Sequence, residues 1–288
     1  MNAFLIALFL GIALGSFSAA VQARLRGFFR RRPAAVFAAP AALTALFAFV
    51  LGASGGWSAV FVSLVAAYAF LPTALVYARR PWLDFAAILL LWLPIEFAAG
   101  KQLLPRAAWS VANLTARGTA VTLALVLFLF FRDLPGMKYN LPRKWSDLLY
   151  PVIGFVAIAP VLAALGLRLG YMGPYLGFGR FHPGAFGLLW LKTALGVAIP
   201  EELLFRALIQ NWLMQRFGDT VRTLAAAALI FGASHLDNPP GPLPNWRYMI
   251  LATVAGLALG KVFSKSSSIW SSAGLHALVN CARHTFFG

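Results

Sequence analysis

Acidic residues are scarce in this 288-residue sequence, which holds 8 Asp and Glu against 24 Lys and Arg. Charged residues of all kinds make up 11% of the chain and hydrophobic residues 61%. Soluble domains carry about 25% charged and about 45–50% apolar residues, so this composition excludes an ordinary soluble domain. It predicts an all-α, polytopic membrane protein, in which most of the length forms spans of about 20 residues each.

Cysteine is nearly absent as well, since Cys281 is the single one, and this excludes an intramolecular disulfide. We expect Cys281 to be a small packing residue. The net charge of +16 would indicate a nucleic-acid partner in a soluble protein. In a membrane protein, basic residues instead anchor cytoplasmic loops, so we expect the lipid bilayer as a partner and no nucleic acid.

Apolar segments follow one another along the whole chain and predict about nine to ten membrane-spanning helices. With the N-terminus outside, roughly twice as many Lys and Arg fall on the cytoplasmic side as on the other, which fits the positive-inside rule. The ten segments are 2–21, 34–53, 57–78, 83–99, 112–131, 148–167, 184–200, 220–236, 247–263 and 268–286.

A long polar connection, residues 132–147, divides the sequence into two expected parts. Residues 1–147 form a five-span membrane region of unassigned role, and residues 148–288 hold all the promising polar groups. We expect a multi-pass integral membrane protein of a prokaryotic inner membrane, because no organellar transit peptide or retention signal is evident. The sequence does not predict an oligomeric state.

Two adjacent glutamates, Glu201 and Glu202, lie within the apolar sequence PEELLFR, where charge is costly. On a helix, neighbouring residues point about 100° apart, whereas residues four apart share a face. Glu202 and Arg206 are therefore predicted to form an ion pair. Glu201 shares its face with Phe205, so its carboxylate needs partners on another helix. Such a carboxylate suits a general base, and the alternative is a structural ion-pair cluster.

A second motif, FGASH, closes the segment 220–236. Phe231 and His235 are four residues apart, so we expect Phe231 to support the histidine. Ser234 directly precedes His235, and adjacent residues do not face each other on a helix. A serine–histidine nucleophile is therefore not expected.

A third motif, HALVN, lies in the last apolar segment. His276 and Asn280 share a helix face, and His284 extends the same stripe. Asn is costly in lipid without partners, so polar residues on one face favour a shared interior site. His284 lies near the chain end and also fits an interfacial position.

The order EExxxR, FxxxH and HxxxN on three separate apolar segments resembles the CAAX protease and bacteriocin-processing (CPBP/Abi) family of intramembrane glutamic endopeptidases. Its eukaryotic relatives include the type II CAAX prenyl endopeptidase. The resemblance covers about residues 148–286 and does not extend to the five N-terminal segments.

This resemblance implies peptide hydrolysis without a cofactor or a metal, acting on a membrane-associated protein or peptide. Glu201 would activate the attacking water, with His235 as its partner. His276 and Asn280 would stabilise the tetrahedral oxyanion, for which positioned donors contribute about 10²–10³ in rate each. The residues implied as supporting the site are Glu202, Arg206 and Phe231.

Three other functions remain open at this point. Glu201, His235 and His276 could form a His₂Glu zinc site, although the sequence has no HExxH motif. A membrane scaffold or binding protein on the same fold would not use the motifs for chemistry. A transporter could relay protons through buried acids and histidines, but no inverted repeat is evident.

Overall fold

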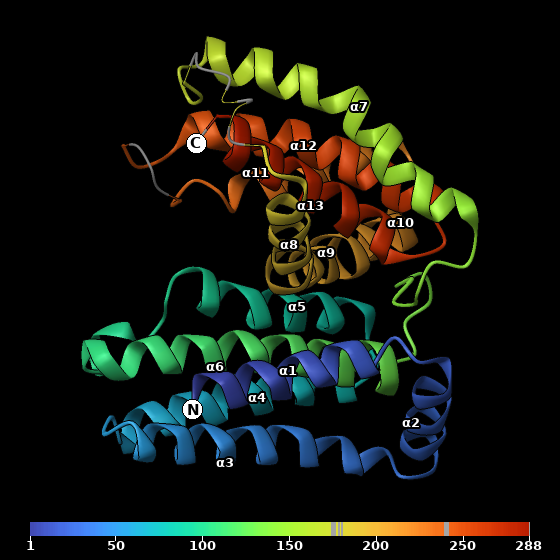
Figure 1. Ribbon diagram of the computed structural model, residues 1–288. Coiled ribbons are helices and arrows are strands. Elements are labelled where there is room, and N and C mark those ends of the chain that lie inside the picture. The colour runs from blue at the N-terminus through green and yellow to red at the C-terminus, as the bar shows by residue number, and fades with distance from the viewer. Residues whose placement is uncertain (174–176, 178, 180, 239–241, 288) are drawn as a thin grey trace. The chain divides into compact units, whose positions relative to one another are not determined.

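The computed structural model describes residues 1–173, 177, 179, 181–238 and 242–287 (Figure 1). Within these residues every regular element is a helix, which confirms the predicted all-α class. Contacts divide the chain into two compact units, Met1–Pro135 and Gly136–Gly288. The two units are described separately below.

All ten predicted apolar segments lie mainly in helices, but the helices differ from simple spans. Among the described residues, five helices are long and apolar enough to cross a membrane, or six if one bent pair forms a single span. The others are shorter or more polar, such as the 13-residue Val221–Ala233. The protein is therefore a multi-pass helical membrane bundle. The five qualifying helices are Pro33–Ala53, Ala59–Tyr77, Arg106–Phe131, Trp145–Arg168 and Trp246–Lys265.

The N-terminal unit is built from six α-helices and three short irregular helices. The first two α-helices are the bent pair, with an angle of 88° between them, and the Ser18 hydroxyl caps the second by accepting a hydrogen bond from Val21. In Figure 1, α2 runs crosswise to α1 and α3. The elements are α1 (Asn2–Gly15), α2 (Ala19–Arg31), η1 (Pro33–Phe37), α3 (Ala38–Ala53), α4 (Ala59–Tyr77), α5 (Pro81–Glu96), η2 (Lys101–Leu103), α6 (Arg106–Ala124) and the π-helix η3 (Leu125–Phe131).

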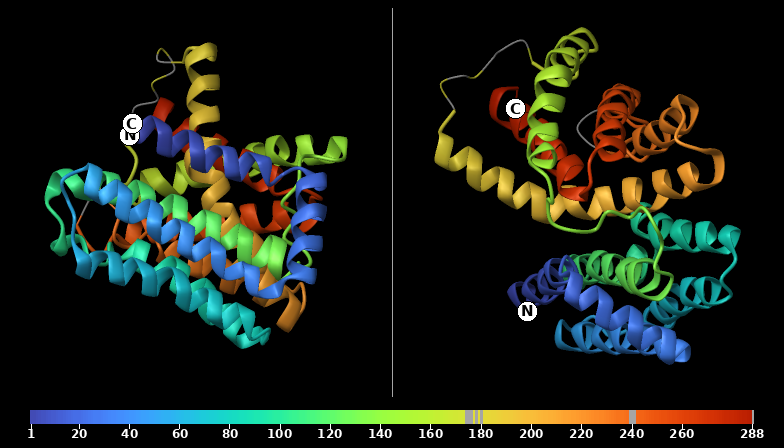
Figure 2. Two further views of the ribbon diagram at one scale, coloured as in Figure 1. Left: turned by 90° about the horizontal axis from the view of Figure 1, so that it is seen from below. Right: turned by 90° about the vertical axis from the view of Figure 1, so that its right-hand side faces the viewer.

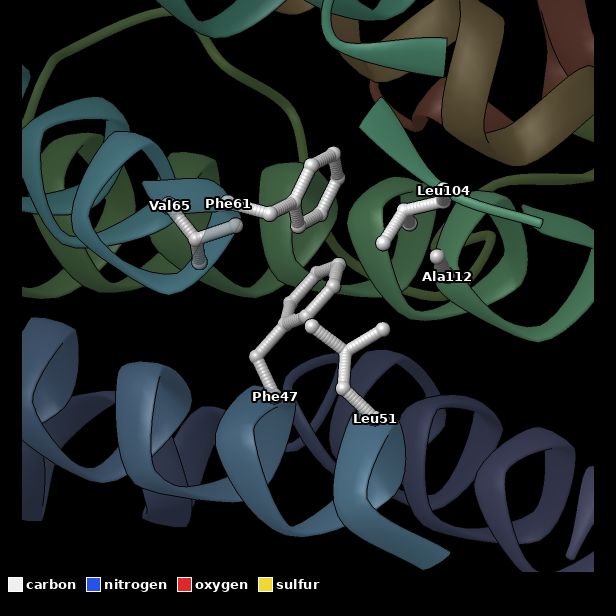
Figure 3. Close-up of a cluster of buried hydrophobic side chains, with 6 residues drawn as sticks. All are labelled: Phe47, Leu51, Phe61, Val65, Leu104 and Ala112. Carbon is white, nitrogen blue, oxygen red and sulfur yellow. The ribbon is translucent and has the colours of Figure 1, made fainter. Parts of the chain in front are cut away.

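An apolar cluster holds this unit together where α3, α4 and α6 meet (Figure 3). The rings of Phe47 and Phe61 lie 5.9 Å apart at its centre. Leu51 is fully buried beneath them. Burial of each such side chain contributes roughly 1.5–3 kcal/mol in water, and inside a bilayer close packing supplies the equivalent stabilisation. The cluster comprises Phe47, Leu51, Phe61, Val65, Leu104 and Ala112.

One ion pair is buried in the same unit, between Asp84 at the start of α5 and Arg132 at the end of η3. Two guanidinium nitrogens of Arg132 donate to the carboxylate, the shortest distance being 2.6 Å. Asp84 is almost fully buried, whereas Arg132 keeps some exposure. The pair joins residues 48 positions apart and satisfies a charge that neither helix could bury alone.

The described residues of the C-terminal unit form a long helical rod and four further helices. The rod runs without interruption from Pro183 to Phe217, and Figure 2 shows it as one bent yellow and gold helix. The elements of the rod are α8 (Pro183–Thr193), the π-helix η5 (Ala194–Ala198), α9 (Ile199–Glu202), the π-helix η6 (Leu203–Gln210) and α10 (Asn211–Phe217). The remaining helices are α7 (Trp145–Arg168), α11 (Val221–Ala233), α12 (Trp246–Lys265) and α13 (Ile269–Phe286).

Small residues allow α11 and α12 to pack closely. A Cβ atom on Gly232 would lie 2.8 Å from the carbonyl oxygen of Met249 and would collide with Thr253. A Cβ on Gly256 would lie 3.2 Å from Ala228. Close backbone approach through small residues is how membrane helices associate without a hydrophobic driving force. The glycine of the FGASH motif therefore sets the position of the residues on either side of it.

The connection between the two units is bound to the C-terminal unit. Lys138 donates to the carbonyl oxygens of Phe263 and Ser264 at 2.7 and 3.2 Å and caps the last turn of α12. Burial lowers the pKa of the Lys138 ammonium. Asp147 accepts hydrogen bonds from both the amide and the hydroxyl of Ser267. These bonds explain why the contacts divide the chain after Pro135, twelve residues before the boundary we expected from polarity alone.

Candidate active site

The two glutamates lie where the long rod changes its helical geometry. Residues 199–202 form a single α-helical turn, and π-helical stretches precede and follow it. Pro200 has no N–H to continue the α-helical ladder, which accounts for an irregular turn at this point. π-helical turns recur at functional sites because they change the direction of the side chains that follow. Apart from the proline, nothing in the sequence indicated this irregularity.

Glu202 and Arg206 form the predicted ion pair. The distance from Arg206 Nε to Glu202 Oε2 is 3.2 Å, and both side chains are completely buried. The pair is therefore fully removed from solvent, where each charge requires its partner. This contact confirms the expectation from four-residue spacing, even though the intervening turn is not regular α-helix.

His276 on α13 contacts both glutamates. Its Nδ1 atom lies 3.1 Å from Glu202 Oε1, and its Nε2 atom lies 3.7 Å from Glu201 Oε2. Ser272, one turn earlier on the same helix, donates its hydroxyl to the carbonyl oxygen of Ile269 at 3.1 Å. The last apolar segment and the glutamate pair, 74 residues apart, thus meet in one polar cluster.

Glu201 differs from its neighbour in exposure. Its side chain is 35% exposed, whereas that of Glu202 is fully buried. Part of the Glu201 side chain is therefore accessible, although its Oε2 atom, which faces His276, is buried. The division of the pair into a working and a supporting carboxylate stays a prediction. The expected approach of Glu201 to His235 stays a prediction.

Phe231 lies at the centre of the aromatic contacts in the site. The guanidinium of Arg206 lies 4.7 Å above its ring, a cation–π contact. The rings of His235 and His276 meet its ring at 4.8 and 5.8 Å in edge-to-face geometry. Phe205 contacts it from the rod at 5.0 Å. Phe231 thus links elements of all three motifs, which is more than support of His235 alone.

His235 lies in the turn that follows α11. Its Nδ1 atom is 2.9 Å from the carbonyl oxygen of Phe231, and its ring contacts Tyr248 at 4.6 Å. Ser234 Oγ also lies 3.1 Å from His235 Nδ1, so the expectation that these neighbours do not face each other is wrong. The reason is that the helix ends at Ala233, where the helical geometry behind that expectation no longer applies.

A cavity of about 90 Å³ opens between α7, α11, α12 and α13. His235, His276 and Asn280 all contribute to its wall, together with Phe231. The rest of the wall is mostly apolar, from residues such as Leu162 on α7. The cavity therefore brings the FGASH and HALVN motifs to one space that an apolar ligand could enter.

His284 does not continue the polar stripe into this cavity. It is exposed, and Arg283 takes the corresponding place in the wall. Residues seven apart on a helix return to within about 20° of the same direction, whereas residues eight apart are displaced by about 80°. Counting seven from His276 would have identified Arg283 from the sequence. The aromatic residues Tyr171 and Tyr248, which also line the cavity, carried no motif and were missed.

No group of three or more His, Cys, Asp and Glu side chains among the described residues has the arrangement of a metal site. Glu201, His235 and His276, the candidate zinc ligands, are distributed between the glutamate cluster and the cavity wall. His276 instead makes its closest contact with the carboxylate of Glu202.

Comparisons with known proteins agree with the motifs. Residues 183–282 match the model of the family described as type II CAAX prenyl endopeptidase Rce1-like. Neither a search of curated proteins nor a search of solved structures found a match. The matched segment spans the rod, α11, α12 and nearly all of α13, and it contains every candidate site residue. Over these residues the chain is thus similar to the Rce1-like family, as the order of the three motifs had indicated.

Proposed function

We propose that the protein is a glutamic-type intramembrane endopeptidase in which Glu201 activates the attacking water. The observation that carries this proposal is the difference between the two glutamates. Glu202 is fully buried and bound by Arg206 and His276, so it is committed to structure. The Glu201 side chain is 35% exposed, so a water molecule can approach it, although its Oε2 atom is buried against His276. A positioned carboxylate base contributes typically 10²–10⁴ in rate.

His235 is prepared to accept a hydrogen bond at its Nε2 atom. A carbonyl oxygen can only accept, so the 2.9 Å contact with Phe231 requires the proton to be on Nδ1. In the neutral ring, Nε2 then carries the lone pair. Such a ring can hold the attacking water while the carboxylate of Glu201 receives its proton.

His276 and Asn280 act as the oxyanion donors in this proposal. The carboxylate of Glu202 also only accepts, so the contact with His276 Nδ1 requires a proton there. For Nε2 to donate as well, the ring must be an imidazolium. The cluster would then be neutral, since two carboxylates balance one guanidinium and one imidazolium, which removes the cost of an uncompensated buried charge.

The proposed substrate is a membrane-associated protein or peptide that enters the cavity beside His235 and Asn280. The mostly apolar wall suits the side chains of such a segment. We place the enzyme in a prokaryotic inner membrane, where maturation of peptides or surface proteins would be its task. The N-terminal unit, outside the matched residues, would serve recognition of that substrate or of a partner.

The test uses a Glu201→Gln variant to capture the substrate. Peptides that co-purify with the full-length variant are identified by mass spectrometry and synthesised. They are then offered to the unchanged protein, to Glu201→Gln and to Glu96→Gln. We expect cleavage by the unchanged protein and a loss of at least about 100-fold in Glu201→Gln. Glu96→Gln, which removes a glutamate near the end of another apolar helix, is the matched control and should cleave normally.

Undiminished cleavage by Glu201→Gln would refute the proposal. If captured peptides bind but are cut by none of the proteins, the chain is instead a binding protein on this fold. Thermal unfolding is measured for each variant to check its folding. If Glu201→Gln unfolds at the same temperature as the unchanged protein, a loss of cleavage reflects lost chemistry and not lost structure.

A further inference from the structure

We propose that Arg283 forms a subsite that binds a carboxylate of the peptide substrate, in the same cavity as His276 and Asn280. The inference deepens the proposed function, since it names the chemical group that the cavity selects. Three observations support it. Arg283 is a cation in a mostly apolar cavity wall, aromatic rings hold its guanidinium, and no aspartate or glutamate forms an ion pair with it.

Arg283 is the only Lys or Arg among the described residues that line the cavity. It follows Asn280 by three positions and His276 by seven, so all three lie on one face of α13. A positive charge thus lies about two helical turns from one proposed oxyanion donor, roughly 10 Å along the axis. A peptide bound with its scissile bond at His276 would place a group a few residues away beside Arg283.

Two tyrosine rings hold the guanidinium in place. Arg283 lies 4.9 Å from the ring centre of Tyr171 and 5.7 Å from that of Tyr248. The two rings stack on each other 5.1 Å apart. Cation–π contacts orient a guanidinium through its faces and leave the edge, where the N–H donors are, for another partner. Tyr248 also contacts His235, which ties this subsite to the proposed water site.

No aspartate or glutamate side chain neutralises this cation. All eight Asp and Glu residues lie within the described part of the structure, and none forms an ion pair with Arg283. In the N-terminal unit and in the rod, by contrast, Arg132 is paired with Asp84 and Arg206 with Glu202. The hydroxyl of Tyr171 is buried and also has no hydrogen-bond partner among the described residues. Guanidinium and hydroxyl are both donors to a carboxylate.

A peptide has two sources of a carboxylate, its C-terminus and an acidic side chain, and the subsite fits the shared group. The test therefore uses a fluorescent, acetylated tetrapeptide of leucine and alanine in three forms. These are the free acid, the C-terminal amide, and an amide in which the last residue is glutamate. Binding to the full-length Glu201→Gln protein in phosphatidylcholine nanodiscs is measured by fluorescence polarisation, so that no turnover interferes.

We expect the free acid to bind about tenfold more tightly than the amide, since a charged hydrogen-bonded pair contributes at least that much. In Glu201→Gln/Arg283→Gln the preference should disappear, and with Arg283→Lys it should persist in part. The glutamate-containing amide shows which carboxylate the subsite accepts. If its affinity equals that of the free acid, the subsite accepts an acidic side chain. If its affinity equals that of the neutral amide, the subsite accepts only the C-terminus. Arg247→Gln, which removes an exposed arginine next to Tyr248, is the matched control and should keep the preference.

Three results would overturn the inference: equal binding of acid and neutral amide, a preference that survives Arg283→Gln, or no binding of any form. If Arg283 has a purely structural role, the acid and the neutral amide bind equally, which is the first result, and Arg283→Gln weakens the binding of all three peptides to the same extent. A lipid role would change retention of added phosphatidylglycerol while leaving the peptide preference unchanged, which is the second. Because the assay measures binding without turnover, a failure of the unchanged protein to cleave peptides would refute the proposed function alone.

Discussion

Each unit of this protein buries one arginine–carboxylate pair, and the two pairs differ in what surrounds them. In the N-terminal unit, Arg132 binds Asp84 through two nitrogens at distances down to 2.6 Å. In the C-terminal unit, the Nε atom of Arg206 lies 3.2 Å from Glu202, which also binds His276. The first carboxylate is saturated by its cation, whereas the second is shared.

This difference separates a structural ion pair from a site. A carboxylate bound on both oxygens by one arginine has satisfied its charge and its lone pairs together. Glu202 divides its two oxygens between Arg206 and His276 and so fixes the orientation of the histidine toward Glu201. The same pair of functional groups thus stabilises helix packing in one unit and positions a ring in the other.

Removal of the arginine should have its largest effect in the C-terminal unit. We expect Arg206→Met to lower the free energy of unfolding by about 3–5 kcal/mol, because it leaves Glu202 buried without its cation. Thermal and denaturant unfolding in detergent micelles measure this loss. The double variant Glu202→Gln/Arg206→Met should recover part of it, and no recovery would show that packing of Arg206 on Phe231 dominates instead.

Removal of the charge in the N-terminal pair should destabilise without affecting chemistry. We expect Asp84→Asn to cost about 1–3 kcal/mol, a smaller loss because Arg132 keeps some exposure and can turn toward water. Peptides captured as described above should still be cleaved at the normal rate. A loss of cleavage at full stability would mean that this pair is also part of the site and that the distinction between the two pairs is wrong.

The smallest expected effect concerns the connection between the units. Lys138→Met removes the cap on α12 and should lower stability by about 0.5–1.5 kcal/mol. Hydrogen exchange should locate the loss at the end of α12 and leave the apolar cluster around Phe47 protected. Increased exchange throughout the N-terminal unit would instead assign Lys138 to that unit, contrary to the contacts seen.

Much of the architecture follows from the sequence because its causes are local. Runs of apolar residues predict helices wherever they occur, and every predicted segment is helical. Helix boundaries and irregular turns were harder to predict. Pro200 is visible in the sequence, but the π-helical turns around it depend on how the rod packs. The end of α11 at Ala233 likewise changed the relation of Ser234 to His235, which helical spacing alone did not predict.

Within the site, the sequence alone determined the pairing of Glu202 with Arg206, since four residues on one helix bring those side chains together. Only the tertiary structure decided that His276 bridges both glutamates and that Phe231 contacts both histidines. Asp84 and Arg132 are a further case, 48 residues apart with no motif to connect them. The physical reason is common to all: spacing along one helix specifies a face, whereas the partner of that face is chosen by the packing of helices distant in the chain.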